Sequence, residues 1–292
     1  MSDSTTATRT WAEPLLPGFE ERSADVRGVR MRYFVGGDGP PLVLVHGLSG
    51  AATNWCELAP LLVRERRVLI PELPGHGGSA PLPAAPSLNG YADRIRHVAE
   101  LEGMLPAPFV GHSLGGSITL RAAIRWREDV PAAVLAASAG IASATRWAQF
   151  WLAFFGKTKP GRRIAPHRSL VAHRDALRYA VFGYWGASDP PALSDRAVDG
   201  LLAGAQHHAD TVSAAQALVR DDPRRDLHDI GCRVLVVWGA RDHQVPIDDA
   251  FEYARRLGAP LRVIADCGHL LVAERPDACL DAIEDFLGRL GL

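Results

Sequence analysis

A serine stands in a Gly-x-Ser-x-Gly frame within the stretch Val110-Gly111-His112-Ser113-Leu114-Gly115-Gly116. The apolar run 107–110 before it predicts a strand, and 117–126 after it predicts a helix. A serine on so sharp a strand-to-helix turn takes a strained backbone conformation, and the flanking glycines let neighbouring elements crowd the turn. The turn would lift the Ser113 hydroxyl above the carboxyl edge of a sheet, where a helix start favours developing negative charge. The pattern therefore predicts a nucleophilic serine.

A hydroxyl is a weak nucleophile, so this chemistry also needs a base and a carboxylate that orients the base. Asp242 follows the apolar strand pattern 232–238 in a Gly-x-x-Asp frame, and His269 follows the shorter strand pattern 261–265. Other carboxylates that could orient the histidine are Asp266, Asp248 and Asp249. The frame after the strand favours Asp242. We therefore expect Ser113, Asp242 and His269 to form a catalytic triad.

A further apolar strand, 42–45, ends in His46-Gly47-Leu48-Ser49-Gly50. This loop and the chain order Ser113, Asp242, His269 are those of the α/β-hydrolase family. Over about 26–290 the chain resembles that family, in its cap-bearing serine esterase and lipase-like branch. The resemblance implies an α/β-hydrolase fold: a mostly parallel eight-stranded sheet flanked by helices, with a helical cap inserted after strand six. It also implies that the backbone N–H groups of Leu48 and Leu114 form the oxyanion hole.

Strand and helix patterns alternate along the chain, which predicts parallel strands joined by right-handed crossovers. A hairpin is expected over 23–35 around Gly28, and the helices are expected at 55–65, 88–105, 117–126 and 276–290. From about 141 to 227 the pattern is helical and loop-like, with no clear strand. We therefore predict an α/β-hydrolase core formed by residues 1–140 and 228–292, and a helical cap, or lid, formed by residues 141–227.

Composition sets the broad class. The chain has 292 residues, of which 22% are charged, and a net charge of −1, so a basic face for nucleic acid or an anionic membrane is not indicated. The polar N-terminus and the lack of an 18-residue apolar segment predict a cytoplasmic protein without a membrane span. Either a monomer or a homodimer is compatible with the sequence.

Metal and cofactor sites are not predicted. The four cysteines show neither metal-ligand spacing nor a paired framework, and Cys267, two residues before His269, is expected to pack rather than react. His207 and His208, near Asp210, are adjacent and would point about 100° apart on a helix, which suits metal binding poorly. We expect no cofactor.

The predicted cap contains an aromatic stretch. Trp147, Trp151 and Phe154 belong to 147–155, where five of nine residues are aromatic. These rings would cover almost every face of a helix, and one lobe cannot bury all of them. Some are therefore expected to line an apolar pocket over Ser113, which favours a hydrophobic acyl or alcohol group in a small ester substrate.

The predicted activity is hydrolysis of a carboxylic ester through an acyl-enzyme. The alternatives are the same triad acting on a C–C bond, a lactone or a peracid, and a ligand-binding homologue without turnover. C–C hydrolases of this family usually carry Trp directly after the catalytic histidine, where this chain has Leu270. The residues around the predicted site are expected to support it. The family usually carries Asp where Glu72 stands, and His46 and His112 are expected to make supporting hydrogen bonds rather than to transfer protons.

Overall fold

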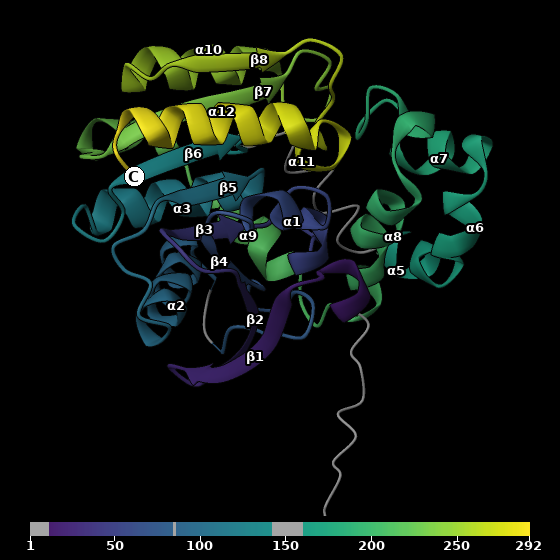
Figure 1. Cartoon of the computed structure of the whole chain (residues 1–292), viewed down its shortest axis with the longest axis horizontal. Coiled ribbons are helices and arrows are strands. Elements are labelled where there is room, and N and C mark those ends of the chain that lie inside the picture. The colour runs from purple at the N-terminus through teal and green to yellow at the C-terminus, as the bar shows by residue number, and fades with distance from the viewer. Residues whose placement is uncertain (1–11, 84–85, 142–159) are drawn as a thin grey trace, which may run out of the picture.

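A sheet of eight strands forms the centre of the computed structural model, which describes residues 12–83, 86–141 and 160–292 (Figure 1). The strands lie in the order β1-β2-β4-β3-β5-β6-β7-β8. Their bounds are β1 Phe19–Val26, β2 Val29–Gly36, β3 Pro41–Val45, β4 Arg67–Pro71, β5 Phe109–His112, β6 Ala132–Ala136, β7 Arg233–Gly239 and β8 Leu261–Ile264. Strand β2 runs antiparallel to β1 and β4, and all other pairs are parallel. The predicted fold class is confirmed.

The first two strands form the expected hairpin around Gly28. Val26 pairs with Val29, so Arg27 and Gly28 make a two-residue turn, and both have a positive φ, of 52° and 75°. This backbone matches the right-handed twist of the flanking strands, and glycine adopts it without steric cost. The hairpin is longer than predicted, because pairing extends from Phe19 to Gly36.

Helices cover both faces of the sheet. They are α1 Ala59–Leu62, α2 Leu88–Leu101, α3 Leu114–Arg125, α10 Ile247–Leu257, α11 Leu271–Glu274 and α12 Pro276–Arg289, with the 3₁₀ turns η1 Glu13–Leu15 and η2 Ala52–Trp55. Helices α2 and α3 pack against each other. Arg66, just after α1, pairs with Glu284 of α12, so these two helices share a face. The central parallel strands β3, β5 and β6 are almost fully buried, as strands covered on both faces must be, whereas the edge strand β8 is partly exposed.

Two expected helices differ from the prediction. The helix expected over 55–65 is divided into η2 and the single turn α1, because Pro60 has no N–H and its ring would clash with a preceding helical turn. The helix expected over 88–105 ends at Leu101, and Gly103 adopts a left-handed φ of 62° just beyond it. Proline and glycine thus shorten both patterns.

The described residues between β6 and β7 form helical elements only, and we name residues 160–232 the insertion. Its elements are α5 Pro160–Ile164, η4 Ala165–His167, α6 Arg168–Ala172, α7 Asp175–Phe182, η5 Pro190–Ala192, α8 Asp195–Ala203, η6 Gly204–Gln206, α9 Val212–Arg220, η7 Pro223–Arg225 and η8 Leu227–Asp229. Helices α5 to α8 make a lobe at the right of Figure 1, whereas α9 lies with the core. The lobe has its own small apolar cluster, which includes Phe182 and Val198. Leu218 of α9 belongs instead to the main core cluster.

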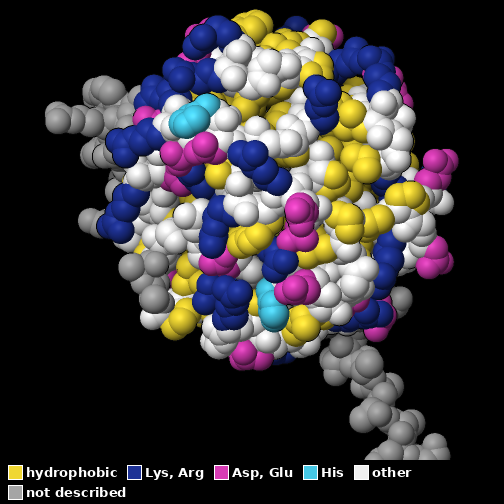
Figure 2. Space-filling model, turned by 90° about the vertical axis from the view of Figure 1, so that its left-hand side faces the viewer, with side chains coloured by type: hydrophobic (Ala, Val, Ile, Leu, Met, Phe, Trp, Pro, Cys, Tyr) yellow, Lys and Arg dark blue, Asp and Glu magenta, His cyan; other side chains and the backbone are white. Residues whose placement is uncertain are grey.

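The face of the molecule away from the lobe carries basic and acidic side chains interspersed with apolar ones (Figure 2). This mixture agrees with the net charge of −1. Across residues 12–83, 86–141 and 160–292, no helix combines the length and the apolar character that crossing a bilayer requires.

Candidate active site

Ser113 occupies the junction between β5 and α3, with φ 55° and ψ −119°. A non-glycine residue in this conformation stores roughly 1–3 kcal/mol of strain, which the surroundings must offset. A Cβ on Gly111 would lie 2.3 Å from Gly115 O, and a Cβ on Gly115 would lie 2.0 Å from Val45 O. Only glycine fits at both positions, so the frame around Ser113 has the steric role that the sequence predicted.

Backbone hydrogen bonds hold this strained turn. The Ser113 N–H donates to Ala136 O over 3.0 Å, and Ser113 O accepts from the N–H groups of Gly116 (2.9 Å) and Ala139 (3.0 Å). Two of these partners lie at or just past the end of β6, so the neighbouring strand fixes the turn. The Ser113 residue is 6% exposed.

The loop after β3 lies against the Ser113 turn. A Cβ on Gly47 would lie 3.1 Å from Ser113 Cβ, and Gly50 N–H donates to Gly47 O over 3.1 Å. Within the described residues, the N–H groups of Leu48 and Leu114 have no hydrogen-bond acceptor. Of the two predicted oxyanion donors, Leu48 lies in the loop that touches the serine turn, and Leu114 is the first residue of α3, directly after Ser113.

Asp242 and His269 are in direct contact. His269 Nδ1 donates to Asp242 Oδ2 over 2.8 Å, and both side chains are buried. The other carboxylate oxygen, Oδ1, accepts from the backbone N–H groups of Gln244 (2.9 Å) and Val245 (2.8 Å), which fixes the carboxylate. Because Asp242 holds Nδ1, the second ring nitrogen of His269 is left to act as a base.

The other candidate carboxylates lie elsewhere. Asp266 is exposed and pairs with Arg241 over 2.8 Å. Asp248 and Asp249 belong to the first turn of α10. Among the carboxylates weighed from the sequence, Asp242 is therefore the partner of His269 in this structure.

His112 connects the serine turn to the histidine loop. Its Nε2 donates to His269 O over 2.8 Å, and the two rings are 4.9 Å apart. Burial, reinforced by the nearby His269, lowers the pKa of His112 to about 3, so it stays neutral. Ser113, next to His112 in the chain, is thereby brought beside the loop of its predicted base.

His46 supports the loop after β3. Its Nδ1 donates to Gly47 O over 2.9 Å, and its Nε2 accepts from the N–H of Leu73 over 3.1 Å. Burial lowers the pKa of His46 to about 3. A neutral ring that both donates and accepts in this way holds the backbone and is not free to transfer protons.

Glu72 is buried beside this loop. Its carboxylate accepts from the N–H groups of Gly78 (2.6 Å) and Ala52 (3.3 Å) and pairs with Arg32 over 3.3 Å. Burial raises the pKa of Glu72 above its ordinary value. The Glu72 side chain thus connects the segments of Arg32, Ala52 and Gly78, which is a structural role.

His208, from the insertion, binds the core beside the predicted oxyanion loop. Its Nε2 donates to Ser49 O and its Nδ1 accepts from the Gly77 N–H, each over 2.9 Å. Both ring nitrogens are therefore already used. Within the described residues, no three or more His, Cys, Asp or Glu side chains are arranged to hold a metal ion.

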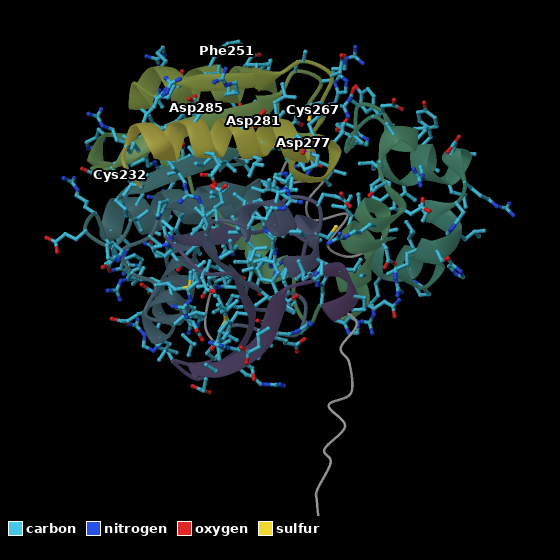
Figure 3. The ribbon with its side chains drawn as sticks, viewed as in Figure 1. Cys232, Phe251, Cys267, Asp277, Asp281 and Asp285 are labelled. Atoms are coloured by element: carbon cyan, nitrogen blue, oxygen red, sulfur yellow. The ribbon has the colours of Figure 1, made fainter. Side chains whose placement is uncertain are left out.

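Cys267 lies at the end of the sheet that faces the lobe, whereas Cys232 lies at the opposite end (Figure 3). The Cys267 thiol is buried, and burial raises its pKa, which disfavours the reactive thiolate. Its sulfur lies 3.7 Å from Gly268 O and 3.9 Å from Glu274 Oε2. Cys267 is thus a buried packing residue of the histidine loop, as expected from the sequence.

The predicted substrate-binding aromatics, Trp147, Trp151 and Phe154, lie outside the described residues. Glu274, by contrast, contacts the histidine loop and was not singled out from the sequence. It lies five residues after His269, and a lone acidic residue at that distance carries no local signal. His208 was considered only as a metal ligand, and its actual partners are backbone groups far away in the chain.

Comparisons with known proteins show the family of the chain. The profile of the alpha/beta hydrolase family matches residues 42–282, and the chain belongs to that family. It is 29% identical over 261 residues to a dihydrolipoyllysine-residue acetyltransferase component of an acetoin cleaving system from Pseudomonas putida. That match covers 87% of this chain and spans 65% of the length of the relative.

Two further proteins are similar over most of their length. A 2-hydroxymuconate semialdehyde hydrolase from Pseudomonas sp. strain CF600 is 29% identical over 271 residues, which cover 89% of this chain and 91% of the relative. The crystal structure of a putative lipase from Acinetobacter baumannii AYE has a TM-score of 0.73 at 24% identity, covering 96% and 93% of the two chains. The latter likeness shows the fold alone.

Proposed function

We propose that the protein hydrolyses a carboxylic ester through a Ser113 acyl-enzyme. The observation that carries the proposal is the 2.8 Å hydrogen bond between the buried His269 and Asp242, on a loop that also contacts the strained Ser113 turn through His112. A serine, a base and an orienting carboxylate, here after the parallel strands β5, β8 and β7 of one sheet, are the parts that acyl transfer needs.

In the first half of the reaction, His269 Nε2 takes the proton of Ser113 Oγ as the oxygen attacks the ester carbonyl. The tetrahedral oxyanion accepts hydrogen bonds from the N–H groups of Leu48 and Leu114. The C–O bond to the alcohol then breaks, and the imidazolium returns its proton to the leaving oxygen. Asp242 holds the Nδ1 proton throughout and stabilises the imidazolium.

In the second half, His269 takes a proton from water, and the hydroxide formed attacks the acyl carbonyl. Collapse of the second tetrahedral intermediate releases the acid and returns the proton to Ser113. Loss of one oxyanion donor typically costs about 3–4 kcal/mol of transition-state stabilisation. Both donors here are backbone groups, so the shape of the loops that Gly47 and Gly115 permit matters more than the side chains.

The proposed substrate is a small ester with a hydrophobic acyl or alcohol part. Support comes from the aromatic stretch that contains Trp147, Trp151 and Phe154, in the sequence between β6 and α5. A pocket-facing ring buried against an acyl chain would contribute about 1.5–3 kcal/mol to binding.

A second candidate uses the same residues on another bond. It is favoured by the similarity to a protein named 2-hydroxymuconate semialdehyde hydrolase. Because a nucleophilic serine serves several substrate classes in one fold, the bond cleaved must be decided by assay.

The test is Ser113→Ala with Ser117→Ala as the matched control. Ser117 lies one turn further along α3, where its hydroxyl donates to Ala139 O over 2.6 Å. Wild type and the control should hydrolyse p-nitrophenyl esters and bind a fluorophosphonate probe covalently, and Ser113→Ala should do neither. Near-wild-type turnover by Ser113→Ala would end the proposal. A C–C substrate or a lactone cleaved faster than every ester would favour the second candidate.

A further inference from the structure

The loop that carries His269 is tied to four different parts of the molecule through four successive residues. In chain order, the bonds are Arg241 N–H to Cys267 O (2.9 Å), Gly268 N–H to Glu274 Oε2 (2.8 Å), His112 Nε2 to His269 O (2.8 Å) and Leu270 N–H to Gly186 O (3.1 Å). Their partners belong to the loop of Asp242, to α11, to β5 and to the insertion. The position of His269 therefore depends on the insertion as well as on the core.

Glu274 makes the link to the insertion stronger. Its residue is 7% exposed at the end of α11. While Oε2 accepts from Gly268, Oε1 accepts from the N–H groups of Ser188 (2.9 Å) and Asp189 (3.2 Å) of the insertion. One carboxylate thus satisfies three backbone donors from two chain segments. A carboxylate accepts on both oxygens and donates on neither, which this set of three donors requires.

The two segments are in direct backbone contact at Gly268. A Cβ there would lie 2.6 Å from Gly186 O and 2.8 Å from the Ser188 nitrogen. With so little room between the segments, a shift of residues 186–189 must displace the histidine loop, or the reverse.

The same part of the insertion also contacts the loop of Asp242. The Tyr184 ring stacks on His243, with the ring centres 4.8 Å apart and the planes 3° from parallel. Arg241 donates to Ser188 Oγ over 3.3 Å. Tyr184 has a positive φ of 57°, a strained conformation that persists only where surrounding contacts hold it. Residues 184–189 therefore contact both loops that supply the base and its carboxylate.

We propose that Glu274 is a positioning residue that aligns His269 and the insertion together. By fixing Gly268 and residues 188–189 to one carboxylate, it keeps the histidine loop in place only when the insertion is seated beside it. The inference rests on the proposed ester hydrolysis for its kinetic consequence, whereas the structural link stands apart from it. Losing the carboxylate should misalign His269 against Ser113 and lower kcat even for an acetate ester.

The kinetic test compares Glu274→Gln and Glu274→Ala with Glu284→Gln. The control removes a carboxylate that pairs with Arg66 over 2.7 Å, on α12. The amide in Glu274→Gln keeps one acceptor oxygen, so it can serve Gly268 or the insertion but not both. We expect kcat for p-nitrophenyl acetate to fall roughly tenfold in Glu274→Gln and further in Glu274→Ala. The control Glu284→Gln should keep its kcat even if its melting temperature falls as much as that of the Glu274 variants.

The second readout is amide hydrogen exchange, which needs no turnover. In both Glu274 variants, exchange should speed up in peptides covering 186–189 and also in those covering 267–270, while the control resembles wild type. Unchanged exchange in either segment, or a Glu274→Gln kcat equal to that of the control, would overturn the proposal. If Ser113→Ala showed that ester hydrolysis itself is wrong, the exchange of the two segments would still decide the role of Glu274.

Discussion

The Ser113 turn is held within the core, by crowding and by backbone hydrogen bonds to the end of β6, whereas the His269 loop is also held by the insertion. Around Ser113 the backbone is crowded by its own core: a Cβ on Gly115 would lie 2.0 Å from Val45 O, and one on Gly47 would lie 3.1 Å from Ser113 Cβ. The His269 loop is held by hydrogen bonds from several elements. Two links lead to the insertion: Leu270 N–H bonds directly to Gly186 O, and Glu274 bonds to both Gly268 and Ser188.

This difference separates two tasks. Steric crowding and backbone hydrogen bonds within one core do not depend on protonation, and they hold the Ser113 turn through contacts that do not involve the insertion. Hydrogen bonds to a second lobe can be altered one at a time, so the position of the His269 loop can follow the position of the insertion. Ser113 is thus positioned by the sheet, and His269 is positioned by the sheet and the insertion together.

The largest expected effect on stability comes from a substitution that breaks the crowded turn. Gly115→Ala places a methyl group 2.0 Å from a backbone oxygen of β3, so the free energy of unfolding should fall by about 3 kcal/mol. Gly161→Ala in α5 is the control, because the nearest atom to its Cβ is 3.4 Å away and alanine favours a helix by about 1 kcal/mol. Urea denaturation should show a large loss only for Gly115→Ala. Equal losses would mean that crowding does not define the serine turn.

A second change removes the orientation of the base without disturbing the serine turn. Asp242→Asn can keep the Oδ1 bonds to Gln244 and Val245 but offers His269 an amide in place of a carboxylate. The wrong tautomer should lower kcat by about 10³–10⁴-fold. Asp266→Asn, which breaks only the exposed pair with Arg241, should stay within about twofold. Steady-state kinetics with a fixed ester measures both, and a comparable loss in the control would refute the assignment of Asp242.

The smallest effect concerns the pH dependence of stability that His208, which joins the insertion to the core, contributes. Burial, the largest cause, lowers the pKa of His208 to about 4 from an ordinary value of 6.5. Above pH 6.5 neither the folded nor the unfolded chain holds this proton. Between pH 6.5 and 4 the unfolded chain binds the proton and the folded one does not, so stability falls as pH falls, by up to about 1.4 kcal/mol per pH unit.

His208→Gln tests this dependence, because an amide can still accept from Gly77 and donate to Ser49 without titrating. The loss of unfolding free energy between pH 7 and pH 5 should shrink by up to about 2 kcal/mol in this variant. His228→Gln, on an exposed side chain, should leave the pH dependence unchanged. An identical pH dependence in His208→Gln and wild type would show that this joint does not titrate.

The parts of the site that local patterns encode were predicted from the sequence. The frame around Ser113 has to be a glycine-flanked turn, and Asp242 and His269 follow strand patterns whose carboxyl ends meet at one edge of a parallel sheet. The helix expected over 55–65 shows where such patterns fail: apolar spacing alone does not reveal that Pro60 divides it.

The links between the insertion and the core were not predicted. Glu274 and Ser188 are separated by 86 residues, and His208 and Ser49 by 159. The side chains of Glu274 and His208 bond to backbone N–H and C=O groups, which almost every residue carries. The residue types of the partners therefore do not mark these contacts in the sequence.

The sequence by itself determined the fold class, the hairpin at Gly28 and the strand ends at which Ser113, Asp242 and His269 lie, because periodicity, glycine and proline act over a few neighbouring residues. Only the tertiary structure decided that Asp242, rather than Asp266, bonds to His269. It alone revealed that Glu274 ties the histidine loop to the insertion. Both depend on distances between segments remote in the chain, which are fixed when the sheet and the insertion pack together.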